Sequence, residues 1–184
     1  MTIDRTREDT AFTSALLDTF FARIHDKPYY IIEETTIRQR LRHGNLPPYL
    51  ANAIRAVSIR YVPSLCGGHV GALRTSQQYA SQSRAEIDVD EPTVDHLQAL
   101  LLLSMASYQS GQGKRSHMLL SHAISIASAL DLHRELPVEL KVSATERESR
   151  RKLFWTCYGE FLQTMSLKVP FGRQFYLRDE RCMR

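Results

Sequence analysis

Residues 121–135 read SHAISIASALDLHRE, a run of small and apolar residues that closes in LDLHR. A helix turns about 100° per residue, which sorts the residues from 117 onward into two sides. The narrow polar side holds His117, Ser121, Ser125, Ser128 and Asp131. The opposite side holds Leu119, Leu120, Ala123, Ile124, Ala127 and Leu130. Because alanine lets a second helix approach closely, we expect this helix to pair with the preceding one as an antiparallel hairpin.

Three histidines in or beside this helix raise the question of a metal site. His117 and His122 lie about 140° apart around the helix, whereas zinc ligands on one helix need a spacing of three or four residues. His133 follows the last turn. There a His or Arg complements the negative end of the helix dipole, and its donors can bond the last carbonyls. The pattern favours a helix-closing role for His133 over a zinc ligand.

Apolar periodicity predicts helices along the rest of the chain. From Phe12 to Ile24 the large apolar side chains recur at steps of four residues. Further helices are predicted over 36–43, 49–61, 72–85 and 93–109, and a long one from a capping box at 143–146 to just before Pro170. No stretch alternates with a period of two, as a strand would. We therefore expect one all-α domain over 1–184, an irregular multi-helix bundle with antiparallel helix hairpins.

Proline and glycine mark the breaks between these helices. Pro47-Pro48 primes the helix that follows, because the first helical turn does not need the missing N–H. Three glycines predict a loop from Ser64 to Gly71. The clearest internal break is IDVDEP at 87–92, with Pro92 as the first residue of the next helix. Residues 93–109 are apolar on most of the helix circumference, so we expect this helix to be the most buried.

Composition excludes several classes of protein. The chain is 43% hydrophobic and 24% charged with a formal charge of +4, values that suit a folded protein and announce no nucleic-acid surface. Its three cysteines, Cys66, Cys157 and Cys182, are too far apart for a disulfide framework or a metal knuckle. The first ten residues lack the apolar core of a secretory signal, and the apolar run 97–106 is too short for a bilayer. We expect a soluble, intracellular protein without a membrane anchor.

Catalytic signatures are weak, which favours a protein that is not an enzyme. No G-x-S-x-G motif or other nucleophile signature occurs, and SGQGK at 110–114 lacks the spacing of a phosphate-binding loop. In ERESRRK, 146–152, acidic residues interleave with basic ones, so a solvated helix start is favoured over a DNA contact. Trp155 stands among aromatic residues at helical spacing and is expected in the core.

Several motifs follow one another in an order that resembles a known family. LLDTFFARIHDKPYYII at 16–32 is similar to an opening helix with an aromatic end, and LANAIRAVSIRY at 50–61 to a helix of the form L-A-x-A-I-x-A-x-x-x-R-Y. A leucine-rich helix and LDLHR, 130–134, come next. The segment 150–155 matches R-R-x-x-W-W, and 172–174 matches a G-R-P turn. Together they resemble the fungal-specific transcription factor domain, the middle homology region of the fungal binuclear zinc-cluster regulators.

This resemblance covers about residues 12–182. The signature residues it carries over, structural or regulatory, are Leu130, Leu132, His133, Arg134, Arg150, Arg151, Trp155, Gly172 and Arg173. The chain departs from the family pattern at Asp131, where glycine is usual, at Phe154, where tryptophan is usual, and at Gln174, where proline is usual. These departures affect local packing first.

The resemblance implies a nuclear regulatory domain that modulates transcription by RNA polymerase II. Partners are expected among other regulators, the transcription machinery or a second copy of the chain. The family's DNA-binding module holds two zinc ions with six closely spaced cysteines, which this sequence lacks. We therefore expect no cofactor here, DNA contact only through a missing module or a partner, and a chain that is a fragment or has lost both ends.

Two other functions stay open at this stage. The first is a small-molecule sensor, in which an inducer enters an apolar pocket rimmed by residues such as His133, Arg134 and Trp155, or else an interaction scaffold without a ligand. The second is a helical hydrolase.

Overall fold

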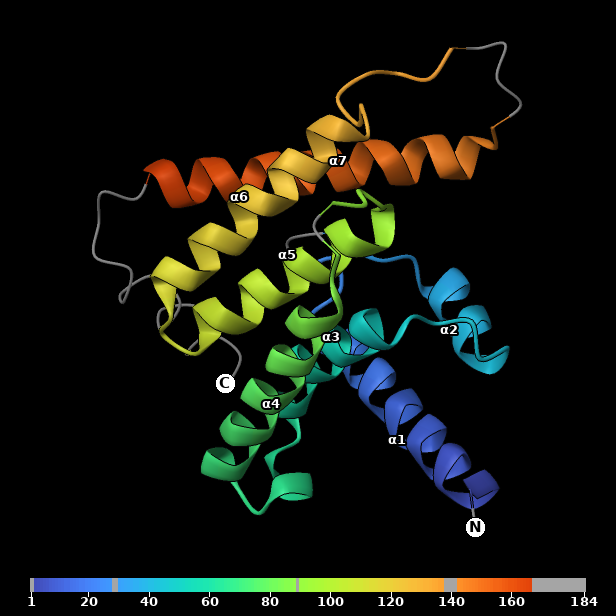
Figure 1. The fold of residues 1–184 in the computed structure, drawn as a ribbon, viewed down its shortest axis with the longest axis vertical. Coiled ribbons are helices and arrows are strands. Elements are labelled where there is room, and N and C mark those ends of the chain that lie inside the picture. Colours follow the sequence, from blue (N-terminus) through green and yellow to red (C-terminus); the bar gives the residue numbers. More distant parts are fainter. Residues whose placement is uncertain (1, 28–29, 89, 138–141, 167–184) are drawn as a thin grey trace, which may run out of the picture.

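The computed structural model describes residues 2–27, 30–88, 90–137 and 142–166, which contain helices and no strand. Figure 1 shows their arrangement. The α-helices are α1 (Thr2–Arg23), α2 (Glu34–Arg42), α3 (Pro48–Ser58), α4 (His69–Glu86), α5 (Val94–Gln109), α6 (Gly113–Ala129) and α7 (Ala144–Ser166). Two 3-10 helices, η1 (Ile59–Tyr61) and η2 (Pro63–Cys66), join α3 to α4. The predicted all-α class is confirmed.

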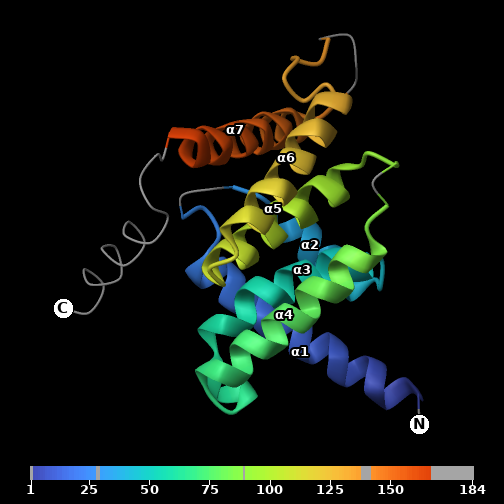
Figure 2. The same cartoon turned by 60° about the vertical axis from the view of Figure 1, so that its left-hand side comes forward.

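The centre of the fold is formed by α3 and α5. Eight of the eleven residues of α3 and ten of the sixteen of α5 are buried, so α5 has the larger number of buried residues but α3 the larger share. Ile54, Leu101 and Leu102 are completely shielded from solvent. In Figures 1 and 2, α5 runs between α6 and α7 at one end of the molecule and α1 and α4 at the other.

The predicted antiparallel hairpin is confirmed for α5 and α6. Three residues join the helices, and Gly111 among them adopts φ 73°, a left-handed conformation that glycine reaches without steric cost. Across the pair, the Ser104 hydroxyl lies 3.0 Å from both the carbonyl and the hydroxyl of Ser116. This buried contact satisfies polar groups that would otherwise weaken a close helix approach.

Polar contacts also fix helices that are distant in the sequence. The Arg40 guanidinium of α2 donates to both carboxylate oxygens of Asp95 in α5, at 2.8 and 2.6 Å. This pairing raises the pKa of Arg40, although partial burial opposes the effect. From α7, the Thr156 hydroxyl donates to the Tyr30 carbonyl at 2.8 Å, and Lys152 Nζ lies 5.0 Å from the Tyr30 ring centre. Helix α7 is thereby joined to the segment that follows α1.

Helix α2 has an acidic N-cap. The Glu33 carboxylate accepts hydrogen bonds from the backbone N–H groups of Thr35 and Thr36, at 3.2 and 2.7 Å. Burial alone would raise the pKa of Glu33, but the hydrogen bonds from the two threonines outweigh it and lower this pKa to about 2. The ionised carboxylate therefore stabilises the start of α2.

Two predicted helix starts were wrong by several residues. Helix α1 begins at Thr2 rather than at Phe12, because the charged residues before Phe12 form a helix without an apolar stripe to reveal it. Helix α4 begins at His69, inside the predicted loop from Ser64 to Gly71. Gly71 lies within the first turn of α4, and glycine is required there because a Cβ would lie 1.7 Å from the Cys66 carbonyl oxygen.

The start of α5 was also misplaced. Thr93 is extended and its hydroxyl accepts from the His96 N–H at 3.1 Å, which makes Thr93 the N-cap. Pro92 therefore precedes the cap instead of being the first helical residue. Among the residues that the structure describes, no helix combines the length and the apolar character that crossing a membrane requires.

Candidate functional site

The end of α6 is a Schellman motif built by the LDLHR sequence. The Asp131 N–H donates to the Ser128 carbonyl at 3.1 Å, and the Leu132 N–H donates to the Ala127 carbonyl at 3.0 Å. Asp131 adopts φ 50°, and Leu132 is only 4% exposed. This geometry explains why the family pattern has glycine at Asp131, since the left-handed conformation favours glycine, while aspartate is one of the few other residues that tolerate it.

A third group completes this helix end from a different helix. Arg150 Nη2 of α7 donates to the carbonyl of Leu130 at 3.1 Å. The sequence favoured His133 for such a contact, but His133 lies beside the cap, with its Nε2 3.8 Å from Asp131 Oδ1. Arg134 Nε also lies near this carboxylate, at 3.6 Å. Arg150, from the signature motif at 150–155, therefore caps α6, the helix that ends in the LDLHR motif.

Helix α7 turns a basic and aromatic face toward the segment after α6. Its start is capped as predicted, because the Ser143 hydroxyl accepts from the Glu146 N–H at 3.1 Å. Residues spaced by three and four positions share one side of a helix. On the side that faces residues 132–136 these are Arg147, Arg150, Arg151, Phe154 and Trp155.

Between these two elements lies a groove of about 320 Å³, which we call the α6–α7 groove. It is lined by residues 132–136 and by the five α7 side chains just named. The structure thus brings together six of the nine signature residues around one groove, and a seventh, Leu130, is bonded to its wall. Gly172 and Arg173 lie outside the described residues.

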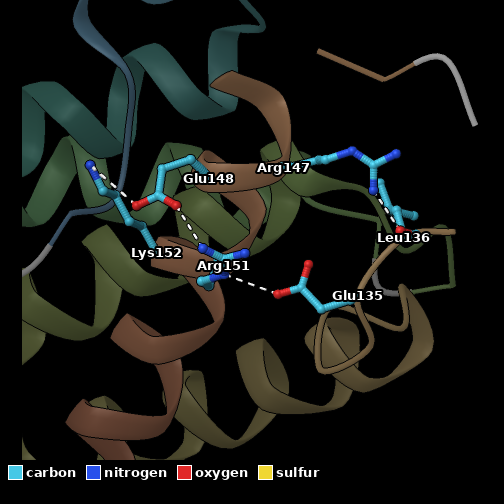
Figure 3. A network of polar contacts seen from close by, with 6 residues as sticks. All are labelled: Glu135, Leu136, Arg147, Glu148, Arg151 and Lys152. Carbon is cyan, nitrogen blue, oxygen red and sulfur yellow. Dashed lines mark hydrogen bonds and ion pairs between the residues drawn. The ribbon is translucent and has the colours of Figure 1, made fainter. Parts of the chain in front are cut away.

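The wall of the groove is held by a network of arginines (Figure 3). Arg147 donates to the backbone carbonyls of Leu136 and Pro137. Arg151 donates to Glu135 through Nε and to Glu148 through Nη1, both at 3.0 Å. The hydrogen bond with Glu135, and then the charges of both glutamates, raise the pKa of Arg151. These contacts anchor the segment after α6 on the surface of α7.

The prediction of a solvated start to α7 is confirmed only in part. Glu148 pairs with the exposed Arg151 and lies 3.9 Å from Lys152 Nζ, as interleaved charges allow. Arg147 and Arg150, in contrast, are half-buried and reach backbone carbonyls of the segment after α6. The order of charges in the sequence does not distinguish an arginine that pairs with a glutamate from one that bonds to backbone carbonyls.

The prediction that Trp155 belongs to the core is wrong. Trp155 is 60% exposed, because Leu153, Thr156 and Cys157 occupy the inward side of this turn of α7. Its ring meets Phe154 edge-on at 5.7 Å and Tyr158 at 6.2 Å. Phe154 and Trp155 therefore line the groove, and the exposed Trp155 forms an open edge where the sequence predicted buried packing.

Four lining residues were not among the predicted signature residues: Glu135, Leu136, Arg147 and Phe154. For Arg147 a signal was available, because it stands three and four positions before Arg150 and Arg151 and must share their side of the helix. Within the described ranges, no group of three or more His, Cys, Asp or Glu side chains is arranged to hold a metal ion.

Comparison with known proteins now defines the family. The family described as "Fungal specific transcription factor domain" matches residues 17–159, which include both walls of the α6–α7 groove. The chain belongs to this family. A member of the family is a part of a transcription factor rather than an enzyme, and the resemblance drawn from the sequence motifs is confirmed.

Curated relatives of this fungal transcription factor domain point the same way. "Zn(2)-C6 fungal-type transcription factor FTF1c" of Fusarium oxysporum f. sp. lycopersici is 30% identical over 177 residues, which cover 90% of this chain and 19% of the relative. FTF2 of the same fungus is 29% identical, covering 90% of this chain and 16% of the relative. "Uncharacterized transcriptional regulatory protein C1327.01c" of Schizosaccharomyces pombe is 29% identical, covering 78% and 16%. No solved structure matches the chain. The chain spans about a fifth or less of the length of these relatives.

Proposed function

We propose that this fungal transcription factor domain acts in the nucleus as a regulatory scaffold that modulates transcription by RNA polymerase II. The family match over 17–159 carries the proposal, and the relatives' names as transcription factors support it. The scaffold has no catalytic role in this proposal and acts through other regulators, the transcription machinery or a second copy of itself.

In this proposal the chain itself binds neither zinc nor DNA. The relatives' printed names specify a Zn(2)-C6 type, whereas this chain has three widely separated cysteines. We therefore propose that zinc is held, and DNA contacted, by a separate zinc-cluster module or by a partner protein. Arg151 of α7 supports this division, because its charge is paired within the domain, with Glu135 and Glu148.

A fusion experiment tests the regulatory role. The chain is inserted between an unrelated DNA-binding domain and an unrelated activation domain, and a reporter gene is measured in yeast against a fusion with an unrelated helical insert of equal length. We expect the chain to change reporter output by about threefold or more. Output equal to that of the control insert would remove the proposal, as would sequence-specific DNA binding by the purified chain in a mobility-shift assay.

The α6–α7 groove favours small-molecule sensing as a second function. The sensor hypothesis predicts a pocket rimmed by His133, Arg134 and Trp155, and all three of these signature residues line the groove. Its volume of about 320 Å³ is at the lower end of the range of small-molecule sites, about 300–1,000 Å³. A thermal-shift screen with metabolites tests this function, because specific binding raises the melting temperature.

A further inference from the structure

The α6–α7 groove carries an excess of positive charge. Four arginines line it: Arg134, Arg147, Arg150 and Arg151. Three carboxylates lie beside them, Glu135 in the lining, Glu148 at Arg151 and Asp131 at Arg134, which leaves one positive charge in excess. An excess of this kind inside a concave surface, with low-dielectric walls, concentrates anions. The groove therefore favours an anionic ligand over a cationic one.

The arginines are not equivalent, and Arg150 is the one that stands out. The charge of Arg151 is matched by Glu135 and Glu148, both at 3.0 Å. Arg150 is half-buried, and within the described residues its hydrogen bond runs to a neutral acceptor, the Leu130 carbonyl. A guanidinium has five N–H donors, and this contact occupies one of them. Arg150 thus brings a charge and several donors to the groove, and no carboxylate of the described residues pairs with it.

An apolar surface lies beside this charge. Leu132 forms part of the groove wall, and Phe154 and Trp155 present aromatic rings from α7. Phe154 is half-buried while Trp155 remains 60% exposed, so the rings offer a face or an edge to a ligand. Aromatic rings next to a cation suit a ligand with a flat or apolar body and an anionic end.

We propose that the α6–α7 groove binds a small organic anion. Its carboxylate or phosphate group pairs with the Arg150 guanidinium, and its flat or apolar body lies against Phe154 and Trp155. Paired N–H donors of arginine match two oxygens of either group. Such a ligand gives the regulatory domain proposed above a chemical input, but binding is measured on the purified chain, so the two proposals fail separately.

Trp155 makes the binding directly measurable. It is the only tryptophan in the chain, so its fluorescence reports on this groove alone. The probes are benzene-1,3-dicarboxylate, phenyl phosphate and, as a neutral match, benzene-1,3-dicarboxamide. We expect a saturable fluorescence change with at least one of the two anions, and an affinity at least tenfold higher than that of the diamide. Comparing the two anions decides between a carboxylate and a phosphate ligand.

Substitutions locate the binding within the groove. Arg150→Gln should weaken binding of the anion tenfold or more, and Arg150→Lys, which keeps the charge, should recover part of it. Arg74→Gln removes the same charge from the exposed side of α4 and should change affinity less than twofold. Glu135→Gln removes the carboxylate that lines the groove and should strengthen binding about threefold. This gain cannot come from a damaged fold.

Three results would overturn the proposal. The first is no saturable change with either anion, or equal affinity for the neutral diamide. The second is an equal loss in Arg150→Gln and Arg74→Gln when circular dichroism shows both variants folded. The third comes from a competition experiment with a decaglutamate peptide. If this peptide displaces a bound anion at a concentration ten times lower than the anion itself needs to occupy the groove, the groove would be assigned to an acidic protein segment instead.

Discussion

Arginines occupy both halves of the molecule, and they do different work in each. Where α2 meets the first turn of α5, Arg40 and Asp95 join the two helices by two short hydrogen bonds, and their side chains are only 28% and 23% exposed. At the α6–α7 groove, Arg150 instead reaches a backbone carbonyl. The first arrangement neutralises a charge to fix two helices, whereas the second fixes a helix end and leaves the charge available. An arginine in the sequence therefore cannot be assigned to stability or to binding until its partners in the structure are known.

Breaking the Arg40–Asp95 pair should have the largest effect on stability. Asp95→Asn removes the charge that faces Arg40 and weakens both hydrogen bonds, so we expect a loss of about 2 kcal/mol in the free energy of unfolding. Urea denaturation followed by circular dichroism measures it. The matched control is Asp18→Asn, since Asp18 is a 65% exposed partner of Arg38 and should contribute less than about 0.5 kcal/mol. Equal losses in the two variants would contradict the comparison.

The acidic cap of α2 should give the next largest effect and a defined pH dependence. Because folding lowers the pKa of Glu33 from 4.5 to about 2, its contribution is complete above pH 4.5 and is lost as the pH falls towards 2. Solvent screening reduces it to about 1 kcal/mol. We expect Glu33→Gln to be less stable at pH 6 and to approach the parent chain near pH 2.5. Denaturation curves at both pH values test this, and a constant difference would reject it.

The smallest effect should be a gain in stability at the end of α6. Asp131→Gly places the residue type that best tolerates φ 50° at the Schellman position, and the exposed ion pairs of Asp131 with His133 and Arg134 are weak. The greater freedom of glycine in the unfolded chain removes part of the benefit, so we expect about 0.5 kcal/mol. The urea midpoint should rise with an unchanged slope. A fall in the midpoint would show that the Asp131 carboxylate stabilises the groove.

Local signals in the sequence predicted the helices well. The stripe from Leu16 to Ile24, the break at 87–92 and the Ser143 cap all depend on neighbours within a few residues, and all three are present in the structure. The start of α1 was missed because helical propensity without an apolar stripe leaves no periodic signal. Gly71 was read as a loop residue because glycine marks loops and close packing alike.

The groove was only partly predictable. His133, Arg134 and Trp155 were predicted to rim an apolar pocket, and all three line the groove, but four arginines make the groove polar instead. The role of Arg150 as a helix cap depends on a contact between residues 20 positions apart, on two different helices. The exposure of Trp155 depends on which side of α7 packs inward. Periodicity gives the spacing of side chains on a helix but not the direction in which that helix presents them.

The bond from Thr156 to the Tyr30 carbonyl bears on how the domain is assembled during synthesis. The two residues are 126 positions apart, so α7 reaches this docking place only after nearly all the preceding helices have left the ribosome. The local α5–α6 hairpin can form earlier, because its contacts span few residues. Both walls of the α6–α7 groove come together only when α7 docks. Among the described residues, the groove is therefore complete only after α7 has docked, whereas the α5–α6 hairpin does not depend on that step.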